Sequence, residues 1–162
     1  MLSPSIYRVK NVGAWNIALS PRPRGGEDLD EEIFSLRAAG VDLVVSLLEA
    51  AEIRELDLLG QKASCERNNI AFCHFPIPDR GIPEHTGNFN SLVALLAREV
   101  EAGKSLVIHC RAGIGRTGLV ACCLLQSLGM KSEQSWLLLG EARGVSVPDT
   151  AEQRKYAESF LS

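Results

Sequence analysis

Short hydrophobic runs alternate with helix-spaced apolar stripes along most of the chain. Apolar runs rich in β-branched residues and bounded by glycine, proline or polar residues predict buried strands. We expect strands near residues 14–19, 41–47, 70–75 and 106–109. Apolar residues spaced three or four positions apart predict amphipathic helices between and after these strands. We expect helices over residues 27–39, 49–57, 60–68, 84–102, 117–128, 131–142 and 149–161.

This order of elements predicts the fold class. Strands that alternate with helices form parallel sheets, and the connecting helices cover both faces of such a sheet. We therefore expect an α/β fold of three layers, with a short, mostly parallel central sheet flanked by helices. A length of 162 residues suits a single domain over residues 1–162. Open α/β sheets bind ligands at the carboxyl ends of their strands, so residues that follow a strand are the first candidates for a site.

Composition narrows the function and the compartment. The formal net charge is −3 at pH 7, which gives no reason to expect nucleic-acid binding. No apolar stretch approaches the length of a membrane-spanning helix, and the start, Met1-Leu2-Ser3-Pro4, lacks the pattern of a signal peptide. The five cysteines include no Cys-x-x-Cys pair, which fits a reducing compartment better than a disulfide framework. We expect a cytoplasmic protein without stable membrane association.

Residues 107–118 carry the strongest chemical indication and read Val-Ile-His-Cys-Arg-Ala-Gly-Ile-Gly-Arg-Thr-Gly. An apolar run delivers His109 and Cys110 to a turn that contains two glycines, and Arg116 and Thr117 then open a helix. A strand, a glycine-permissive loop and a helix N-terminus gather backbone N–H groups into an anion site. Such surroundings favour the thiolate form of a cysteine, and an arginine offers two parallel donors to a phosphate group. The stretch is suited to attack by sulfur on phosphorus.

The same stretch resembles the signature loop of the cysteine-dependent protein tyrosine and dual-specificity phosphatases, in which Arg-Thr-Gly follows His-Cys after five residues. The resemblance implies that Cys110 is the nucleophile and Arg116 a catalytic phosphate clamp. The residues expected to bind phosphate are Arg111, Ala112, Gly113, Ile114, Gly115 and Arg116. A softer similarity, from about Arg24 to Phe160, is to the compact phosphatases related to the cyclin-dependent-kinase-associated phosphatase.

Two neighbours of the nucleophile have expected roles. Thr117 is expected to donate a hydrogen bond to the Cys110 sulfur, which makes that sulfur a better leaving group in the second step. His109 is expected to brace the loop through hydrogen bonds rather than to act as the base. For Cys110 and Arg116 themselves, the alternative interpretation is a buried structural cysteine beside a surface arginine. The length of the match between residues 107–118 and the signature loop disfavours this alternative.

A second motif, Ile-Pro-Asp-Arg-Gly-Ile-Pro over residues 77–83, resembles the mobile Trp-Pro-Asp-x-Gly-x-Pro loop of tyrosine phosphatases. Ile77 stands in place of the tryptophan. The leaving oxygen must be protonated as the P–O bond breaks, and this makes Asp79 the expected general acid. The alternative is a turn aspartate between two prolines, in which case Asp28 or Glu84 is the next candidate for the acid.

A third segment, residues 148–156, resembles the Gln-Thr-Ala-x-Gln segment that helps to position water in tyrosine phosphatases. Thr150 and Gln153 match this pattern, whereas Asp149 replaces its first glutamine. Gln153 is expected to support the site by contacting phosphate or the hydrolytic water. Whether Asp149 positions water stays open, because Asp149 and Thr150 are equally suited to cap the last helix.

These motifs predict a protein phosphatase that hydrolyses phosphotyrosine, with phosphoserine and phosphothreonine as further substrates, through a cysteinyl-phosphate intermediate. The expected partner is a phosphorylated protein or peptide. No cofactor or metal is expected, because the three histidines are dispersed along the chain. The oligomeric state is left open.

Two other functions compete with this one. The first is a phosphatase of phosphoinositides or other non-protein phosphomonoesters, which is disfavoured because Arg111 is the only basic residue among the variable loop positions. The second is an inactive phosphate-binding module, which is disfavoured because the cysteine, the arginine and the aspartate are all present. Whether Cys65 or Cys73 forms a protective disulfide with Cys110 is a separate open question.

Overall fold

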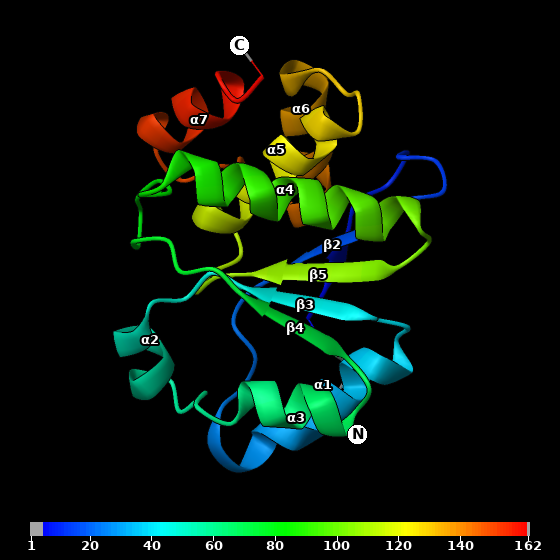
Figure 1. The fold of residues 1–162 in the computed structure, drawn as a ribbon, viewed down its shortest axis with the longest axis vertical. Coiled ribbons are helices and arrows are strands. Elements are labelled where there is room, and N and C mark those ends of the chain that lie inside the picture. The colour runs from blue at the N-terminus through cyan, green and yellow to red at the C-terminus, as the bar shows by residue number, and fades with distance from the viewer. Residues whose placement is uncertain (1–4, 162) are drawn as a thin grey trace.

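A computed structural model describes residues 5–161, in which a five-stranded sheet lies between two layers of helices (Figure 1). The strands are β1 (Tyr7–Arg8), β2 (Asn16–Ser20), β3 (Leu43–Ser46), β4 (Ala71–His74) and β5 (Ser105–His109). The helices are the short 3₁₀ turn η1 (Gly26–Asp28), α1 (Leu29–Ala38), α2 (Ala50–Glu55), α3 (Gln61–Arg67), α4 (Thr86–Glu101), α5 (Gly115–Ser127), α6 (Ser132–Arg143) and α7 (Ala151–Glu158).

The sheet has the strand order β1-β2-β5-β3-β4. β1 pairs with β2 antiparallel, whereas the pairs β2–β5, β5–β3 and β3–β4 are parallel. The predicted α/β fold with a mostly parallel sheet is therefore confirmed, and β1 is an addition to it. Because β5 is the central strand, the chain that leaves its carboxyl end emerges in the middle of the sheet edge.

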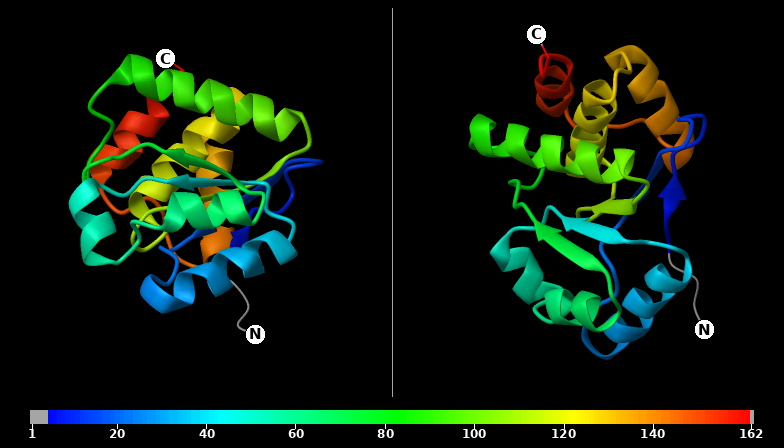
Figure 2. Two further views of the ribbon diagram at one scale, coloured as in Figure 1. Left: turned by 60° about the horizontal axis from the view of Figure 1, so that its bottom comes forward. Right: turned by 45° about the vertical axis from the view of Figure 1, so that its right-hand side comes forward.

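Side chains of the parallel strands alternate between the two faces of the sheet, as the pleat requires. Val45 and Ile108 point into the larger hydrophobic core, and Val44 and Val107 point into the smaller one. Helices α4, α5, α6 and α7 cover the first face, and α1 and α3 cover the second (Figure 2). Helix α5 is buried almost all round because α4, α6 and α7 pack against it.

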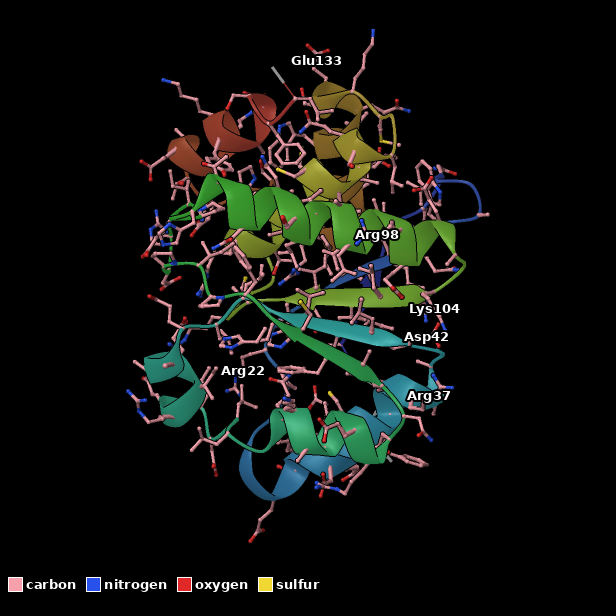
Figure 3. All side chains as sticks on the ribbon, in the orientation of Figure 1. Arg22, Arg37, Asp42, Arg98, Lys104 and Glu133 are labelled. Atoms are coloured by element: carbon pink, nitrogen blue, oxygen red, sulfur yellow. The ribbon has the colours of Figure 1, made fainter. Side chains whose placement is uncertain are left out.

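At the amino-terminal edge of the parallel strands, charged side chains bind one another and tie the strands together. Arg37 at the end of α1 lies 3.0 Å from a carboxylate oxygen of Asp42, and Lys104 lies at the same edge (Figure 3). The other oxygen of Asp42 accepts from the N–H of Ser105 at 2.9 Å, which ties the starts of β3 and β5 together. This hydrogen bond holds the pKa of Asp42 below its ordinary value. The opposite, carboxyl-terminal edge, where α2 and α5 begin, carries the candidate site residues.

The expected helices are confirmed with shifts at their ends. Helix α5 starts at Gly115, two residues before the predicted start, so that Arg116 lies inside its first turn. The segment over 27–39 begins with η1 and continues as α1. Among the described helices, none combines the length and the apolar composition that crossing a bilayer requires.

Candidate active site

The segment of residues 110–116, called the cysteine loop here, runs from the end of β5 into the first turn of α5 at the middle of the sheet edge. Three successive carbonyl oxygens of this loop accept hydrogen bonds from outside it: Cys110 O from His109 Nδ1 at 3.1 Å, Arg111 O from the Arg22 N–H at 3.1 Å, and Ala112 O from Arg143 Nη2 at 3.0 Å. In a trans peptide, the carbonyl of one residue and the N–H of the next point in opposite directions. Carbonyls held outward therefore turn the following N–H groups inward, which forms an anion cradle.

Two glycines allow the cysteine loop to pack against its neighbours. Gly113 has a φ of +75°, and a Cβ atom there would lie 2.5 Å from the carbonyl oxygen of Ser20 at the end of β2. A Cβ atom at Gly115 would lie 2.8 Å from Cβ of Asp149 and 2.9 Å from Oε1 of Gln153. Any larger residue at either position would separate the loop from β2 or from the start of α7.

A cavity of about 250 Å³ opens over the cysteine loop. Its lining contains Cys110, Arg116 and Asp79, together with Asp149 and Gln153. The three sequence motifs therefore meet at one place. Cys110 is nearly fully buried, so its sulfur is reached only from this cavity.

Arg116 is the most constrained charged residue of the site, with only 2% of its surface exposed. Its Nη1 donates to Glu52 Oε1 at 2.7 Å and to the carbonyl oxygen of Ile77 at 3.0 Å. Its Nη2 donates to Glu52 Oε2 at 2.9 Å and to Asp79 Oδ1 at 3.1 Å. One edge of the guanidinium is thus clamped by Glu52, and the edge formed by Nε and Nη2 is engaged by Asp79 at Nη2.

Glu52, at the third position of α2, was not predicted as a site residue. Burial by itself raises the pKa of Glu52, but hydrogen bonds from Arg116 and from the Glu49 N–H outweigh it and leave the pKa below its ordinary value. Burial likewise lowers the pKa of Arg116, but its hydrogen bonds to Glu52, together with electrostatic contributions from Cys110, Glu52 and Asp79, raise it above its ordinary value. The pair is therefore ionised at neutral pH.

The loop of residues 77–83, called the acid loop here, is fastened to the start of α7. Arg80 lies 2.6 Å from Asp149 Oδ2, and the carbonyl oxygen of Gly81 accepts from Gln153 Nε2 at 3.1 Å. Asp79 itself is 59% exposed at its side chain, so it lies at the mouth of the cavity rather than at its floor. Asp149 is thus paired with Arg80 while it lines the cavity, and whether it positions water stays open.

Gln153 serves as both a cap and a wall of the cavity. Its N–H donates to Thr150 Oγ1 at 3.1 Å, and its Oε1 accepts from the N–H groups of Asp149 and Thr150 at 3.1 Å each. This arrangement is a capping box at the start of α7. One of the two Nε2 hydrogens donates to Gly81, which leaves the second available to a ligand in the cavity.

The two neighbours of Cys110 differ in their contacts. His109 Nδ1 donates to the Cys110 carbonyl, and its Nε2 accepts from Gln61 Nε2 at 2.9 Å. Burial, with a smaller contribution from the charge of Arg116, lowers the pKa of His109 to about 4, so its imidazole is neutral. The hydroxyl of Thr117 is buried and makes no hydrogen bond to any described residue, Cys110 included. The role expected for Thr117 stays a prediction.

Neither candidate for a disulfide with Cys110 lies close to it. All five cysteines are free thiols. Cys65 lies in the smaller core, on the other face of the sheet, and burial raises its pKa to about 12. Cys73 is aligned with Val45, which is aligned in turn with Ile108 two residues before Cys110. Two strand spacings amount to about 9.5 Å, whereas bridged cysteines have Cα atoms within about 7 Å. Either disulfide requires the backbone to move.

Comparison with known proteins places the chain. The family model described as Swiss Army Knife protein, DSP-PTPase phosphatase domain, matches residues 8–155. The chain belongs to this phosphatase family. The resemblance seen in the sequence motifs is thereby confirmed. Within residues 5–161 of this phosphatase domain, no three His, Cys, Asp or Glu side chains gather where a metal ion could bind.

Relatives of this phosphatase domain are distant in sequence. It is 27% identical over 135 residues to rat cyclin-dependent kinase inhibitor 3, covering 82% of this chain and 63% of the relative. It is 33% identical over 105 residues to putative tyrosine phosphatase 197R of Invertebrate iridescent virus 6, covering 62% of this chain and 37% of the relative. The chain thus spans less than two thirds of the length of the curated relatives it matches.

Solved structures share the fold over nearly the whole chain. A crystal structure of kinase-associated phosphatase, with serine in place of the catalytic-site cysteine, aligns with a TM-score of 0.88 at 20% identity and covers 99% of this chain and 95% of that one. The active form of Tk-PTP aligns with a TM-score of 0.76 at 26% identity and covers 98% and 97%. The arrangement of sheet and helices is therefore the common fold of this family.

Proposed function

We propose that residues 1–162 form one protein phosphatase domain that hydrolyses phosphotyrosine, and phosphoserine and phosphothreonine in addition, by way of a cysteinyl-phosphate intermediate. One observation carries the proposal: Cys110, Arg116 and Asp79, which come from separate motifs, line a single cavity above inward-facing N–H groups. A tetrahedral phosphoryl group fits such a cradle, because N–H donors and a guanidinium bind the oxygens that carry its charge.

In the first step, the Cys110 thiolate attacks phosphorus in line with the leaving oxygen. The S–P bond forms as the P–O bond breaks, and the leaving oxygen takes a proton from the carboxyl group of Asp79. The inward N–H groups of the cysteine loop and the free edge of Arg116 stabilise the charge on the equatorial oxygens. His109 takes no part in proton transfer, because its imidazole is neutral and both of its nitrogens are engaged inside the protein.

Arg116 also links substrate binding to the acid. Its Nη2 now donates to Asp79, at 3.1 Å, and the phosphate dianion competes for the same donor. A bound dianion takes Nη2 together with Nε as a bidentate pair. Asp79 is then released from the guanidinium, takes up a proton from solvent and turns to the leaving oxygen as the acid. Glu52 keeps the guanidinium plane in place while this exchange occurs.

In the second step, water attacks the phosphorus of the cysteinyl phosphate. The water gives a proton to the Asp79 carboxylate, the S–P bond breaks, and the electron pair returns to the sulfur. Inorganic phosphate and the thiolate are the products. The spare Nε2 hydrogen of Gln153 faces the cavity as a donor for the attacking water or for a phosphate oxygen.

Charges beside the cavity favour a phosphoprotein over a polyphosphorylated headgroup. Arg80 is paired with Asp149 at 2.6 Å, and Arg111 is paired with Glu55 at 3.4 Å. A headgroup with several phosphates needs cations without such partners, so a single phosphomonoester on a protein or peptide suits the site better. We also propose a cytoplasmic location, because a thiolate nucleophile needs a reducing compartment.

The decisive test replaces Cys110 by serine. We expect Cys110→Ser to abolish turnover of p-nitrophenyl phosphate and of phosphotyrosine peptides while it still binds tungstate. Cys73→Ser, a half-buried cysteine outside the cavity, is the matched control and should keep wild-type turnover. Residual turnover by Cys110→Ser would exclude the nucleophile. Tungstate binding without any wild-type turnover would identify an inactive phosphate-binding module, and a clear preference for phosphoinositides in the same assay would overturn the protein substrate.

The role of Asp79 is tested separately with asparagine. Loss of the proton donor should reduce turnover by about 10²–10⁴-fold, most for substrates with poor leaving groups. Loss of the charge that competes for Arg116 should at the same time tighten tungstate binding. An equal, small loss across leaving groups would point to another acid, with Glu84 or Asp28 the next to test.

A further inference from the structure

The carbonyl oxygen of Ala112 is held by a residue that no motif contains. Arg143, the last residue of α6, donates from Nη2 to this oxygen at 3.0 Å. Its guanidinium carbon lies 4.3 Å from the centroid of the Tyr7 ring in β1, the geometry of a cation–π contact. Among the described residues, no carboxylate forms an ion pair with Arg143, and its buried Nε has no hydrogen-bond partner. The arginine is therefore placed by an aromatic ring and a loop carbonyl.

The peptide group between residues 112 and 113 precedes a glycine with a positive φ. Gly113 has a φ of +75°, and glycine adopts a wide range of φ, so its own sterics do not fix the orientation of the peptide group before it. The bond from Arg143 is made in the orientation in which the Ala112 carbonyl points outward. In that orientation the N–H of Gly113 points inward, towards the space that a phosphoryl oxygen occupies in the proposed function.

The seat of Arg143 is itself built by two elements. Helix α6 ends at Arg143, because the next residue, Gly144, has a left-handed backbone with a φ of +80°. Tyr7 is held against Leu19 of β2 by the antiparallel pairing of β1. The short strand β1 thus extends the sheet and also places the Tyr7 ring against the Arg143 guanidinium.

We propose that Arg143, seated on Tyr7, is a positioning residue that aims the Gly113 N–H at the phosphoryl group. This inference rests on the proposed function of the cavity. Arg143 touches no reacting atom. It acts through the Ala112 carbonyl, and it leaves the nucleophile, the acid and the Arg116 clamp untouched.

The test compares Arg143→Met with a matched arginine. Arg154 of α7 is also stacked on an aromatic ring, with its guanidinium carbon 5.2 Å from the Trp136 centroid, and its ion pair is with Glu158. It has no hydrogen bond or ion pair with the cysteine loop, so Arg154→Met loses the same kind of stacking without the proposed effect. The measurements are kcat/KM for p-nitrophenyl phosphate and the dissociation constant of tungstate, the latter in a Cys110→Ser background.

Removal of one donor to a developing oxyanion lowers rates by about 10²–10³-fold, and a donor that is only disoriented costs less. We expect Arg143→Met to lower kcat/KM by about tenfold and to weaken tungstate binding by a similar factor, with Arg154→Met within about twofold of wild type on both. Arg143→Lys keeps the charge without the planar fork, so its kcat/KM and tungstate affinity should lie between those of wild type and those of Arg143→Met. Tyr7→Leu removes the ring on which Arg143 is stacked but leaves the Arg143 donor, and should lower kcat/KM by about threefold.

A spectroscopic signature separates positioning from general support. In ¹⁵N spectra, the Gly113 amide of wild-type protein should shift on addition of tungstate, and in Arg143→Met this shift should be largely lost while the Arg111 amide still responds. An unchanged Gly113 response, or equal effects of the two methionine variants, would overturn the proposal. If Arg143→Met does not fold, the same spectra of Tyr7→Leu decide. Wild-type protein without turnover would contradict the proposed function, yet the Gly113 response would still settle the role of Arg143.

Discussion

Replacement of Glu52 by glutamine tests the buried pair that holds Arg116 with almost no change of shape. Both carboxylate oxygens of Glu52 accept from Arg116, at 2.7 and 2.9 Å, and only 7% of Glu52 is exposed. A glutamine at this position offers a single oxygen. Its amide N–H₂ group would face the second guanidinium nitrogen, which leaves one hydrogen of that donor unsatisfied and removes one of the two carboxylate charges beside a buried cation.

The size of the effect follows from these contacts. Breaking a buried ion pair costs about 3–5 kcal/mol, and one hydrogen bond to a charged group contributes about 1.5–3 kcal/mol. Because glutamine retains one of the two bonds, we expect the free energy of unfolding to fall by about 2–3 kcal/mol. For a domain of this size, that corresponds to a melting temperature lower by about 5–10 °C. Turnover should fall by about tenfold or more, because Glu52 no longer holds the Arg116 guanidinium in the position in which its other edge binds phosphate.

Urea unfolding and p-nitrophenyl phosphate turnover measure the two effects. Glu55→Gln is the matched control, since Glu55 lies on the same helix, faces Arg111 at 3.4 Å and is 64% exposed at its side chain. An exposed pair of this kind contributes about 0–1 kcal/mol. If Glu52→Gln destabilises the protein by no more than Glu55→Gln does, the buried pair does not hold Arg116 and the reasoning is wrong.

The pH dependence of the same difference has a definite sign. The pKa of Glu52 is lower in the folded protein than its ordinary value, about 4.3 in an unfolded chain. Its charge therefore stabilises the fold fully above this ordinary value, and the contribution is lost as the pH falls through the lower folded pKa. The stability gap between wild type and Glu52→Gln should be constant near neutral pH and should shrink below about pH 4.

Three further outcomes are expected. Burial lowers the pKa of His109 from 6.5 to about 4. The contribution of the neutral His109 to the free energy of unfolding should therefore be complete above pH 6.5 and should fall by about 3 kcal/mol towards pH 4. Urea unfolding at several pH values measures this loss, which should be smaller in His109→Gln. Gly113→Ala should lose at least about 100-fold in turnover through steric overlap and backbone strain, whereas Gly103→Ala, with similar φ but open space around it, should keep its turnover. Arg80→Ala and Asp149→Asn break the same exposed pair, so each should lower stability by less than about 1 kcal/mol while both lower kcat by a similar factor, because the acid loop loses one fastening.

The secondary structure could be predicted where burial imposes a repeat. Val44 and Val45 face opposite cores, so a fully buried strand shows as an unbroken apolar run. The apolar face of α4 recurs at helical spacing because only that face meets the sheet. β1 has no such pattern, since two residues, Tyr7 and Arg8, are too short to show a period. Its pairing depends on β2 being in place, which is tertiary information.

The candidate site was predictable only as far as it lies in contiguous motifs. Cys110, Arg116 and Asp79 each belong to a short stretch with its own spacing. Glu52 belongs to a helix whose alternating charges are typical of a solvated surface, and its one local feature is the bond from the Glu49 N–H that starts α2. Arg143 is similar, because a basic residue in the last turn of a helix is a common capping choice. Their contacts with the cysteine loop exist only after separate elements have packed.

The division between the predicted and the unpredicted residues has a physical basis. Groups proposed to touch the phosphoryl group must be a few ångströms apart, and a short loop achieves this with residues close in sequence. The orientation of those groups has to be imposed from outside the loop, because a loop that contains glycine does not hold its own peptide planes. Glu52 of α2 supplies that orientation by holding one guanidinium edge, and Arg143 of α6, seated on Tyr7 of β1, does so by holding the Ala112 carbonyl. A motif can therefore indicate the reaction class, while the orientation of the groups that it supplies depends on side chains that the motif does not include.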